Sequence, residues 1–522
     1  MKMKPSFIAL AIAGLFLGGR TASAQEPPAV PSDPSLTAPP GAPPNPDAPP
    51  PPAAPTPPPA PVVVPAPVPV VVAAPPVAEE PLAGVSNGTM FLRSPDNLFQ
   101  FFPNGRLQND GYFFHSDAPS GVPRNTFFVK RARLELAGWI DNVVYFQIGA
   151  EFASPPAPAG TNYVATDNFV ALAPWGDMAI LQFGQFDAPF TLENRTSDKY
   201  IDFMERSLTV RAFGIPTNKE QGFMLHGTND ARNYYYSASI LNGDGQNFKN
   251  LDNSFDLMGR AWVAPASFLG EGPMHDITVG GSYWTGNRNF ANPLANQTTP
   301  GGFKIFDASL PKLGMDTATL NQQGRQHTYA FEVNAPIAHK FGVRWEFVHK
   351  NQPLSAIDTT MGPTSIAAGL HLKGWSQYFE AWGWVFGDDR IIGEPGMQLP
   401  TRYKKFGVKP PQHGLMIAAR LEFLDETLSA DDAGGPVGLL TVKPNSYGKT
   451  KVTSFTLGAN YWISKRFRLS GNWTLNDFGG DTNYVTCPAS MMPDSCGGAK
   501  GLKGLGNAKT EQEFAFRFAI AL

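Results

Sequence analysis

The sequence predicts an all-β protein: a 16-stranded antiparallel transmembrane β-barrel preceded by a disordered Pro-rich segment. Three observations lead to this fold class. Charged residues make up only 16% of the 522 residues, whereas soluble domains carry roughly a quarter. Aromatic residues reach 12%, with 38 Phe. From about residue 98, apolar and polar residues alternate with a period of two over segments of roughly ten residues, which is the pattern of membrane-spanning strands.

Residues 1–24 have the features of a secretory signal peptide. Lys2 and Lys4 supply a positively charged start, residues 7–17 an apolar core, and residues 22–24 a cleavage site of small residues. The apolar stretch is shorter than the ~20 residues that a membrane-spanning helix needs. We therefore expect this segment to be cleaved rather than to stay as an anchor.

Residues 25–97 are expected to form a Pro-rich, disordered linker in the periplasm. Of the 51 prolines, 24 fall between Pro27 and Pro81, and no Lys or Arg occurs between Arg20 and Arg93. Because proline lacks a backbone donor and such a segment has little to bury, an extended polyproline-like chain is favoured. Two roles stay open for it: a passive spacer, or a tether that contacts the peptidoglycan of the cell wall.

The barrel is predicted over residues 98–522. Connections between its strands alternate between short and long, as short periplasmic turns and longer external loops do in outer-membrane barrels. The connection at 387–408 is the exception, because it is long and yet falls on the periplasmic side. The sixteen expected strands are 104–114, 125–140, 142–153, 161–173, 178–187, 219–229, 232–242, 253–266, 274–286, 324–337, 339–351, 369–386, 409–426, 447–463, 465–478 and 509–522.

Alternation within each strand assigns its two faces. A charge on the lipid face at mid-depth costs ~2–4 kcal/mol, so the charged parity is expected to face the lumen. The last strand is the clearest case, because Phe514, Phe516 and Phe518 alternate with charged or small residues such as Arg517. The same reasoning directs inward Arg131, Arg133, Glu135, Glu151, Asp256, Arg260, Arg344, Glu346, Arg420, Glu422, Arg466, Arg468 and Glu513. It directs toward lipid Val343, Trp345, Phe347, Leu415, Ile417, Leu421, Phe467 and Leu469.

A barrel of sixteen strands leaves an aqueous channel, and a polar lumen of this width is typical of a pore. The chain has a formal net charge of −3, which does not indicate a nucleic-acid partner. The function that the pattern favours is therefore passive diffusion of small hydrophilic solutes across an outer membrane, with membrane lipid around the barrel and no cofactor.

Several segments resemble one known family. LQFGQFDAPFTLENRTSDKYIDFMERSL (181–208) closely resembles the phosphate-selective porin O/P family of Gram-negative outer membranes. GRLQNDGYFF (105–114) and FFVKRARLEL (127–136) resemble its first two strands. FGVKPPQHGLMIAARLEFLD (406–425) is similar to its long periplasmic turn and the following strand, which would account for the long connection there. The resemblance covers roughly residues 98–522.

The resemblance implies a homotrimer in which each barrel has an external loop folded into its lumen. Here that loop would be residues 188–218. It is expected to be partly helical, with Thr196 or Ser197 capping a turn. One apolar face of this loop would pack against the barrel wall or serve the pore, and packing is the favoured role. The residues on that face are Tyr200, Phe203, Met204 and Leu208.

The resemblance also implies an anion site at the narrowest part of the pore. The family's adjacent Arg residues on the second strand fall on Lys130 and Arg131 here, and its loop Lys falls on Asn194, beside Arg195. Strict alternation points Lys130 away from Arg131 unless a bulge turns it inward. The full set of expected pore and anion-binding residues is Lys130, Arg131, Arg133, Asp167, Asn194, Arg195 and Lys199.

Two departures from the family pattern, at Lys130 and Asn194, leave open whether the pore selects phosphate. Arg holds phosphate in a bidentate fork, whereas Lys130 is a point charge, and Asn194 carries no charge. The expected permeants are small anions such as phosphate, and a weakly selective general pore is the alternative. Each arginine in the set would then be a lumen residue paired with a carboxylate such as Glu135 or Glu151.

Cys487 and Cys496 lie in the last external loop and are expected to form a local disulfide, since the compartment is oxidising. The eight His residues show no metal-ligand spacing, and no G-x-S-x-G or P-loop motif occurs. We therefore expect neither a metal site nor catalytic residues. Two other function classes stay open: an outer-membrane enzyme such as a barrel lipase, and a cell-envelope anchor that uses the Pro-rich arm.

Overall fold

The computed structural model describes most of the chain beyond residue 80. The predicted signal peptide, residues 25–80 and both cysteines lie outside the described residues, so the expectations about them stay predictions. Residues 87–88 and 394 are also left out. The described ranges are 81–116, 125–153, 164–294, 297–300, 304–306, 309–311, 317–358, 364–403, 413–430, 436–437, 440–442, 448–479, 485–486 and 510–521.

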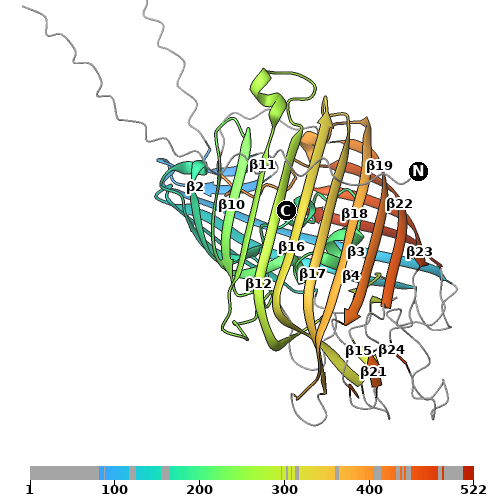
Figure 1. Cartoon of the computed structure of the whole chain (residues 1–522). Helices are drawn as coiled ribbons and strands as arrows, with labels where there is room; N and C mark the ends of the chain where they lie inside the picture. Colours follow the sequence, from blue (N-terminus) through green and yellow to red (C-terminus); the bar gives the residue numbers. More distant parts are fainter. Residues whose placement is uncertain are drawn as a thin grey trace, which may run out of the picture. The chain divides into compact units, whose positions relative to one another are not determined.

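Sixteen antiparallel strands close into a barrel, as the alternation predicts (Figure 1). The last strand pairs with the first, from Glu511 opposite Ser116 to Ala521 opposite Arg106. All sixteen expected strands occur in the expected order. They are β3 (Phe99–Ser116), β4 (Thr126–Ile140), β5 (Val144–Glu151), β7 (Asn168–Leu172), β8 (Ile180–Asp187), β9 (Lys219–Thr228), β10 (Tyr234–Leu241), β11 (Asp256–Val263), β12 (Thr278–Pro293), β16 (Thr317–Ile337), β17 (Phe341–Asp358), β18 (Thr364–Phe386), β19 (Gly414–Ala430), β22 (Gly448–Ser464), β23 (Phe467–Gly479) and β25 (Thr510–Ala521).

Four short strands extend the same sheet: β1 (Ala83–Ser86), β2 (Thr89–Arg93), β6 (Val164–Ala165) and β15 (Ser309–Pro311). The β1–β2 hairpin continues onto β3, where Leu92 lies opposite Phe101. Regular structure therefore begins before residue 98, which corrects the predicted boundary of the linker at residue 97. The physical reason is the apolar side chain of Phe91, which is buried against the ring of Tyr403.

The remaining regular segments lie in connections between the barrel strands. Two small sheets consist of β13 (Gln297–Thr298) with β14 (Lys304–Phe306), and of β20 (Pro436–Val437), β21 (Leu440–Val442) and β24 (Val485–Thr486). Four 3₁₀ turns cover Gly176–Met178, Pro216–Asn218, Pro265–Leu269 and Asp389–Ile391. Within the described ranges, no helix is long and apolar enough to cross a membrane.

The two faces of the wall follow the predicted parity. On β17, Val343 is 52% exposed, whereas Glu346 is completely buried inside the barrel. On β25, Phe514 and Phe518 are exposed and Arg517 is buried. The exposed apolar belt is where lipid would lie, and many charged side chains of the interior form ion pairs, such as Arg260 with Glu332 and Arg517 with Asp110.

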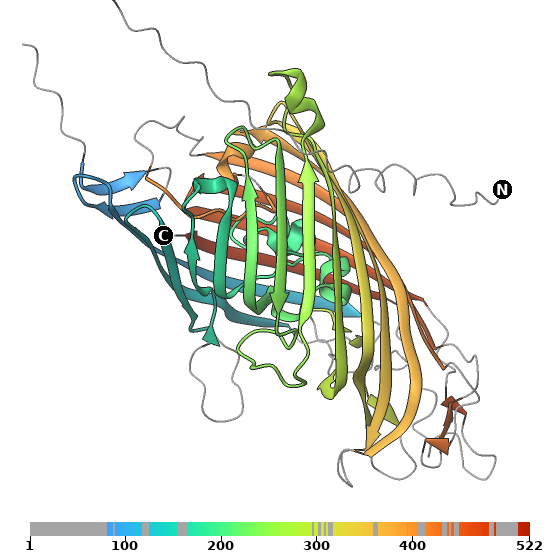
Figure 2. The same cartoon turned by 60° about the vertical axis from the view of Figure 1, so that its left-hand side comes forward.

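The wall is not equally tall around the ring. β5, β8, β10 and β11 have 8 residues each and β7 has 5, whereas β16, β17 and β18 have 21, 18 and 23. Figure 2 shows the short strands side by side and the long strands on another part of the wall. Short strands therefore form one continuous side of the barrel.

Tight turns join several strands at the end of the barrel that carries the hairpin. The turn between β4 and β5 uses Asp141 and Asn142, with φ of 53° and 54°. Asp and Asn tolerate this left-handed conformation because their short polar side chains bond locally. The long connection at 387–408 is at the same end, as predicted, and residues 387–403 fold across the barrel mouth.

The connection 188–218 folds into the lumen, as the resemblance implies (Figures 1 and 2). It contains α1 (Leu192–Arg195) and α2 (Leu208–Phe213). The N-cap residues are Thr191 and Ser207, so the expected cap at Thr196 or Ser197 is wrong; Thr196 and Ser197 follow the first helix instead of starting one.

The apolar face of this connection packs against the barrel wall. Phe203 lies with Trp382 and Trp462, Met204 with Tyr112, and Leu208 with the largest apolar cluster. Packing therefore accounts for Phe203, Met204 and Leu208, whereas Tyr200 packs beside the cluster of Phe203 and also lines the cavity described below. The connection is named the inner loop below.

Candidate functional site

The inner loop is fixed to the wall by carboxylates that receive its backbone N–H groups. Leu192 N and Glu193 N donate to the two carboxylate oxygens of Glu346 on β17, over 3.0 and 2.8 Å. Leu208 N donates to Glu422 on β19. These N–H groups lie at the first positions of α1 and α2, where a helix has no partner of its own for them. The two carboxylates thus anchor both helices inside the barrel.

Residues 387–403, named the strap, cross the opposite side of the lumen. Arg260 on β11 donates to the carbonyl of Gly396 over 2.6 Å, and Trp139 on β4 donates to that of Thr401 over 2.7 Å. The strap also touches the inner loop, since Gly396 N donates to the hydroxyl of Thr196 over 2.9 Å. Two connections that enter from opposite ends of the barrel therefore meet within it.

A cavity of about 610 Å³ lies between the strap, the inner loop and the wall of β3 to β9. Eight basic and five acidic side chains line it, an excess of three positive charges. The basic residues are Arg106, Lys130, Arg131, Arg133, Arg195, Lys199, Arg206 and Lys219. The acidic residues are Glu135, Glu151, Asp167, Asp187 and Asp198.

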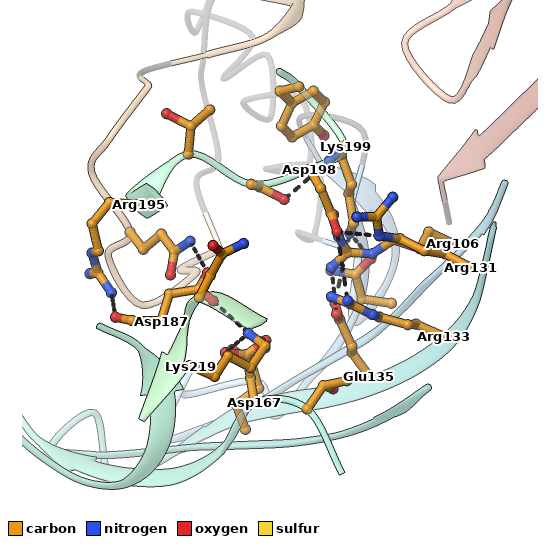
Figure 3. Close-up of a pocket in the computed structure, with 18 of the residues that line it drawn as sticks. Arg106, Arg131, Arg133, Glu135, Asp167, Asp187, Arg195, Asp198, Lys199 and Lys219 are labelled. Atoms are coloured by element: carbon orange, nitrogen blue, oxygen red, sulfur yellow. Dashed lines mark hydrogen bonds and ion pairs between the residues drawn. The ribbon is translucent and has the colours of Figure 1, made fainter. Parts of the chain in front are cut away.

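One group of charges gathers on β3 and β4 around a carboxylate of the inner loop (Figure 3). Asp198 forms ion pairs with Arg106, with Arg131 Nε at 2.5 Å and with Arg133 at 3.6 Å. Further carboxylates hold two of these arginines: Glu135 lies 2.6 Å from Arg106, and Glu151 lies 2.7 Å from Arg133. The sequence expectation that arginines of this strand pair with Glu135 or Glu151 is met for Arg133.

A β-bulge brings Lys130 to the same side as Arg131. Gln108 on β3 pairs with Arg131, but the next residue, Asn109, pairs with Val129, so Lys130 is the extra residue. Its ammonium lies 2.5 Å from Glu205 of the inner loop. An inserted residue breaks the strict alternation of a strand, and this allows adjacent Lys130 and Arg131 both to line the cavity.

A second group lies across the cavity, near the end of β8 (Figure 3). The Lys219 ammonium is 2.7 Å from Asp167 and 2.6 Å from Asp187. Arg195 of the inner loop donates to the backbone carbonyl of Asp187. Asp167 therefore lines the cavity as expected, and its ionic partner is Lys219.

Two arginines of the inner loop bond to carbonyls instead of carboxylates. Arg195 contacts the Asp187 carbonyl, and Arg206 donates to the carbonyls of Glu193 and Thr196. Among the described residues, no ion pair links either of them to a carboxylate. Their charges are consequently less compensated than those of the wall, which accounts for part of the positive excess.

Asn194 does not line the cavity, in contrast to the expectation from the family pattern. It is completely buried in α1, where its amide donates to the carbonyl of Ala188 over 3.0 Å. The backbone of a short helix turns this side chain toward the inner loop itself. The other six expected residues, Lys130, Arg131, Arg133, Asp167, Arg195 and Lys199, all line the cavity.

Seven of the thirteen charged lining residues were not in the expected set: Arg106, Glu135, Glu151, Asp187, Asp198, Arg206 and Lys219. Arg106 could have been found, because it lies on the same parity of its strand as the charged Asp110. Asp198 belongs to the inner loop, where the sequence shows charges of both signs but not which one meets the wall. Lys219 is the first residue of β9, where the alternation of polar and apolar residues does not yet show which way its side chain points. Its position opposite Asp167 therefore follows only from the fold.

Lys199 has a perturbed proton affinity. Its ammonium donates to Asn104 over 2.6 Å and lies 3.8 Å from Glu135. Burial within the cavity wall and the nearby charge of Arg106 lower the pKa of Lys199 to about 8. This group would therefore titrate at mildly alkaline pH, unlike an ordinary lysine.

The arrangement can attract and hold an anion through its positive charges and hydrogen-bond donors. In the described part of the chain, no three His, Cys, Asp or Glu side chains are grouped so that they could hold a metal ion. The cavity therefore supplies charge and hydrogen-bond donors.

One family model matches part of the chain. Residues 104–295 match the family model described as phosphate-selective porin O and P, so the resemblance found in the sequence is confirmed over that range. That family consists of outer-membrane channel proteins, so the match supports a channel rather than an enzyme. No curated protein sequence matches the chain.

Several solved structures of outer-membrane proteins are similar to the chain. Outer-membrane expressed OmpT of Vibrio cholerae has 10% identity and a TM-score of 0.49, with 83% of this chain and 100% of that chain covered. The channel DcaP of Acinetobacter baumannii has 9% identity and a TM-score of 0.44, with 83% and 99% covered. OmpF of Salmonella typhi, in complex with daunomycin, has 11% identity and a TM-score of 0.42, with 82% and 99% covered.

Proposed function

We propose that this chain, whose residues 104–295 match the family model described as phosphate-selective porin O and P, is an outer-membrane porin that passes small hydrophilic anions, phosphate among them. The observation that carries the proposal is the cavity beside the inner loop, where eight basic side chains face five acidic ones. Selectivity in a pore follows from the charges and donors at its narrow part.

The residues that would contact a passing anion are those of the arginine cluster, together with Lys130, Arg195 and Lys199. Arg106, Arg131 and Arg133 converge from two adjacent strands, and guanidinium groups match the geometry of phosphate and carboxylate. Arg195 adds a charge from the opposite wall of the cavity. Transport is passive and requires no cofactor.

The test is the reversal potential of the wild-type channel in a planar bilayer under a KCl gradient. We expect it to move toward the chloride equilibrium potential, and inorganic phosphate to reduce the chloride current. The double variant Arg131→Gln/Arg133→Gln should lower the chloride-to-potassium permeability ratio severalfold. A wild-type reversal potential near zero, or shifted toward the potassium equilibrium potential, would instead indicate a weakly selective or cation-preferring pore.

The matched control is Lys249→Gln, which removes one positive charge from an exposed external loop away from the cavity. Its permeability ratio should equal that of the wild type. Equal losses in this control and in the double variant would mean that overall charge, rather than the cavity, sets the preference.

We also propose that the porin is a homotrimer joined along its short side. A strand of 8 residues tilted by ~45° spans only about 19 Å, less than the ~25 Å apolar band of an outer-membrane barrel. The wall from β5 to β11 is thus too low to face lipid alone, and a neighbouring copy could cover it.

For the N-terminal region we propose a cleaved signal peptide over residues 1–24 and a periplasmic tether over residues 25–80. The support is the composition of these segments, since a Pro-rich chain reaches ~3.1 Å per residue. Co-sedimentation of the mature protein with isolated peptidoglycan tests the tether. Equal sedimentation of a variant lacking residues 25–80 would reduce the segment to a spacer.

A further inference from the structure

The arginine cluster of the cavity is already occupied by a carboxylate of the protein itself. Asp198 is only 6% exposed and pairs with Arg106, Arg131 and Arg133. In the described part of the chain, Arg131 makes no ion pair with another carboxylate, whereas Arg106 and Arg133 have Glu135 and Glu151 on the wall. Asp198 thus supplies the negative charge next to Arg131, the one arginine of the three without a carboxylate partner on the described part of the wall.

The position of Asp198 on the inner loop differs from that of the other acidic residues in the cluster. Glu135 and Glu151 belong to β4 and β5, which are fixed by the ladders of the barrel. Asp198 begins a turn, closed by a hydrogen bond from Tyr200 N to the Ser197 carbonyl over 2.9 Å. Its carboxylate is therefore a tethered group, able to leave the arginines by local rotation without breaking a strand pair.

We propose that Asp198 is a built-in competitor for anions: its carboxylate occupies the Arg106–Arg131–Arg133 cluster and must be displaced before a permeant phosphate or carboxylate binds there. This rests on the proposed anion preference and assigns Asp198 as the residue that sets anion affinity. A tethered ligand acts at an effective concentration of about a millimolar or more. A dilute external anion would therefore bind weakly and leave quickly.

Weak binding suits a channel. Conduction requires a site that attracts the permeant but also releases it, and three converging arginines without a counter-charge would hold phosphate for long periods. The Asp198 carboxylate offers the arginines an alternative partner each time an anion departs. With this competing carboxylate, the arginine cluster binds an anion weakly enough for the anion to leave and pass through the channel.

The flanks of Asp198 are held independently of its side chain. Thr196 accepts a hydrogen bond from Gly396 N of the strap over 2.9 Å, and Asp202 lies 2.5 Å from Arg344. The two helices on either side are anchored by Glu346 and Glu422. A substitution at Asp198 is therefore expected to leave the loop inside the barrel.

The experiment compares phosphate block of the chloride current in the wild type and in Asp198→Asn. Asn has nearly the same shape but no charge. We expect the phosphate concentration for half block to fall by about tenfold or more, the equivalent of one charge-assisted hydrogen bond. If Asp198→Asn does not insert as a channel, Asp198→Ser, which also removes the charge, takes its place.

Three further variants define the mechanism. Asp198→Glu keeps a tethered carboxylate, so phosphate should block its chloride current at the same concentration as in the wild type. Asp230→Asn removes a charge from an exposed turn away from the cavity and should also behave like the wild type. In the double variant Asp198→Asn/Arg131→Gln, phosphate should no longer block at a lower concentration than in the wild type, because one of the three arginines that would bind it is missing.

Other outcomes overturn the inference. If Asp198→Asn binds phosphate as weakly as the wild type, the carboxylate does not compete; if it binds more weakly, Asp198 supports the arginines instead. Both readings assume a wild-type channel that prefers anions, measured in the same bilayers. A wild type that conducts mainly potassium overturns the proposed function, and phosphate block insensitive to Asp198 in an anion-preferring channel overturns this inference alone.

Discussion

Single residues decide how the charges of the lumen are arranged. The parity of β4 correctly directs Arg131 and Arg133 inward, because a charge facing lipid is too costly. Lys130 reaches the same cavity only through a bulge opposite Gln108 and Asn109. Bulges depend on the pairing with a neighbouring strand, so a sequence pattern allows one but does not place it.

Lys199 makes the anion preference depend on pH. Its pKa is lowered to about 8, so the side chain is charged below that pH and neutral above it. We expect the chloride-to-potassium permeability ratio to fall as pH rises from 7 to 9. The measurement is the reversal potential under a fixed KCl gradient at each pH.

The matched variant for this prediction is Lys199→Arg. Arginine stays charged in this range, because its ordinary pKa exceeds 12. The decrease between pH 7 and 9 should therefore disappear in this variant. An equal decrease in the variant and in the wild type would assign the titration to another group.

At the scale of elements, the inner loop and the strap shape the lumen. Helical propensity contributes little to α1 and α2, which have only 4 and 6 residues. Their positions follow from carboxylates of β17 and β19 that accept their first N–H groups. The loop is thus held by the wall, through contacts more than a hundred residues apart in the sequence.

Glu346→Gln should loosen the inner loop. The change replaces one oxygen by an NH₂ group in a side chain that accepts two backbone N–H groups of α1 and the hydroxyl of Tyr378. The amide cannot accept all three of these hydrogen bonds with the same geometry, and each contributes ~0.5–1.5 kcal/mol, so part of the anchoring is lost. We expect a larger single-channel conductance and more current noise, measured in planar bilayers.

The control for the loop prediction is Glu271→Gln, which alters an exposed carboxylate on a turn between β11 and β12. Its conductance should match that of the wild type. If Glu346→Gln also conducts like the wild type, the remaining contacts at Glu422 and Asp202 suffice to hold the loop.

The strap connects the lumen to the N-terminal hairpin. Tyr403 at its end packs on Phe91 of β2, with ring centroids 4.7 Å apart, and its N–H donates to Gln100 of β3 over 2.9 Å. The strap also reaches the cavity through Gln398, which donates to Asp187 over 2.6 Å. The start of the described chain is therefore linked to the pore lining through a few side chains.

For the whole molecule, the unequal height of the barrel predicts how copies assemble. On the short side, Phe183 of β8 and Phe223 of β9 stack with centroids 4.4 Å apart and are both about half exposed. In a trimer joined along this side, these rings would be covered. Their apolar area would then stabilise the contact at roughly 25 cal/mol per Å² buried.

The double variant Phe183→Ala/Phe223→Ala should therefore lower the temperature at which the trimer separates, followed by unheated gel electrophoresis or by mass photometry in detergent. The comparison is Phe379→Ala on the long strand β18, also about half exposed. It should leave the trimer unchanged. A monomer in the wild type, or equal effects of both variants, would contradict the short-side interface.

The strand count, the order of the strands and the inner and outer faces of the wall could all be predicted from the amino-acid sequence. These follow from local periodicity and from the high cost of a charge in lipid, which apply within each strand separately. It also indicated the inner loop and the long periplasmic connection, through their resemblance to one family. The described structure bears out all sixteen strands and both connections.

The pairing of charges inside the barrel, in contrast, depends on the folded arrangement of its loops and strands. Asp198 and Arg131 are 67 positions apart by their numbers, and Lys219 lies 52 from Asp167. An ion pair depends on distances of a few ångströms, and these exist only once the loop and strap are folded between the walls. The same reason explains why Asn194 turned away from the cavity while Arg106, Asp198 and Lys219 entered it.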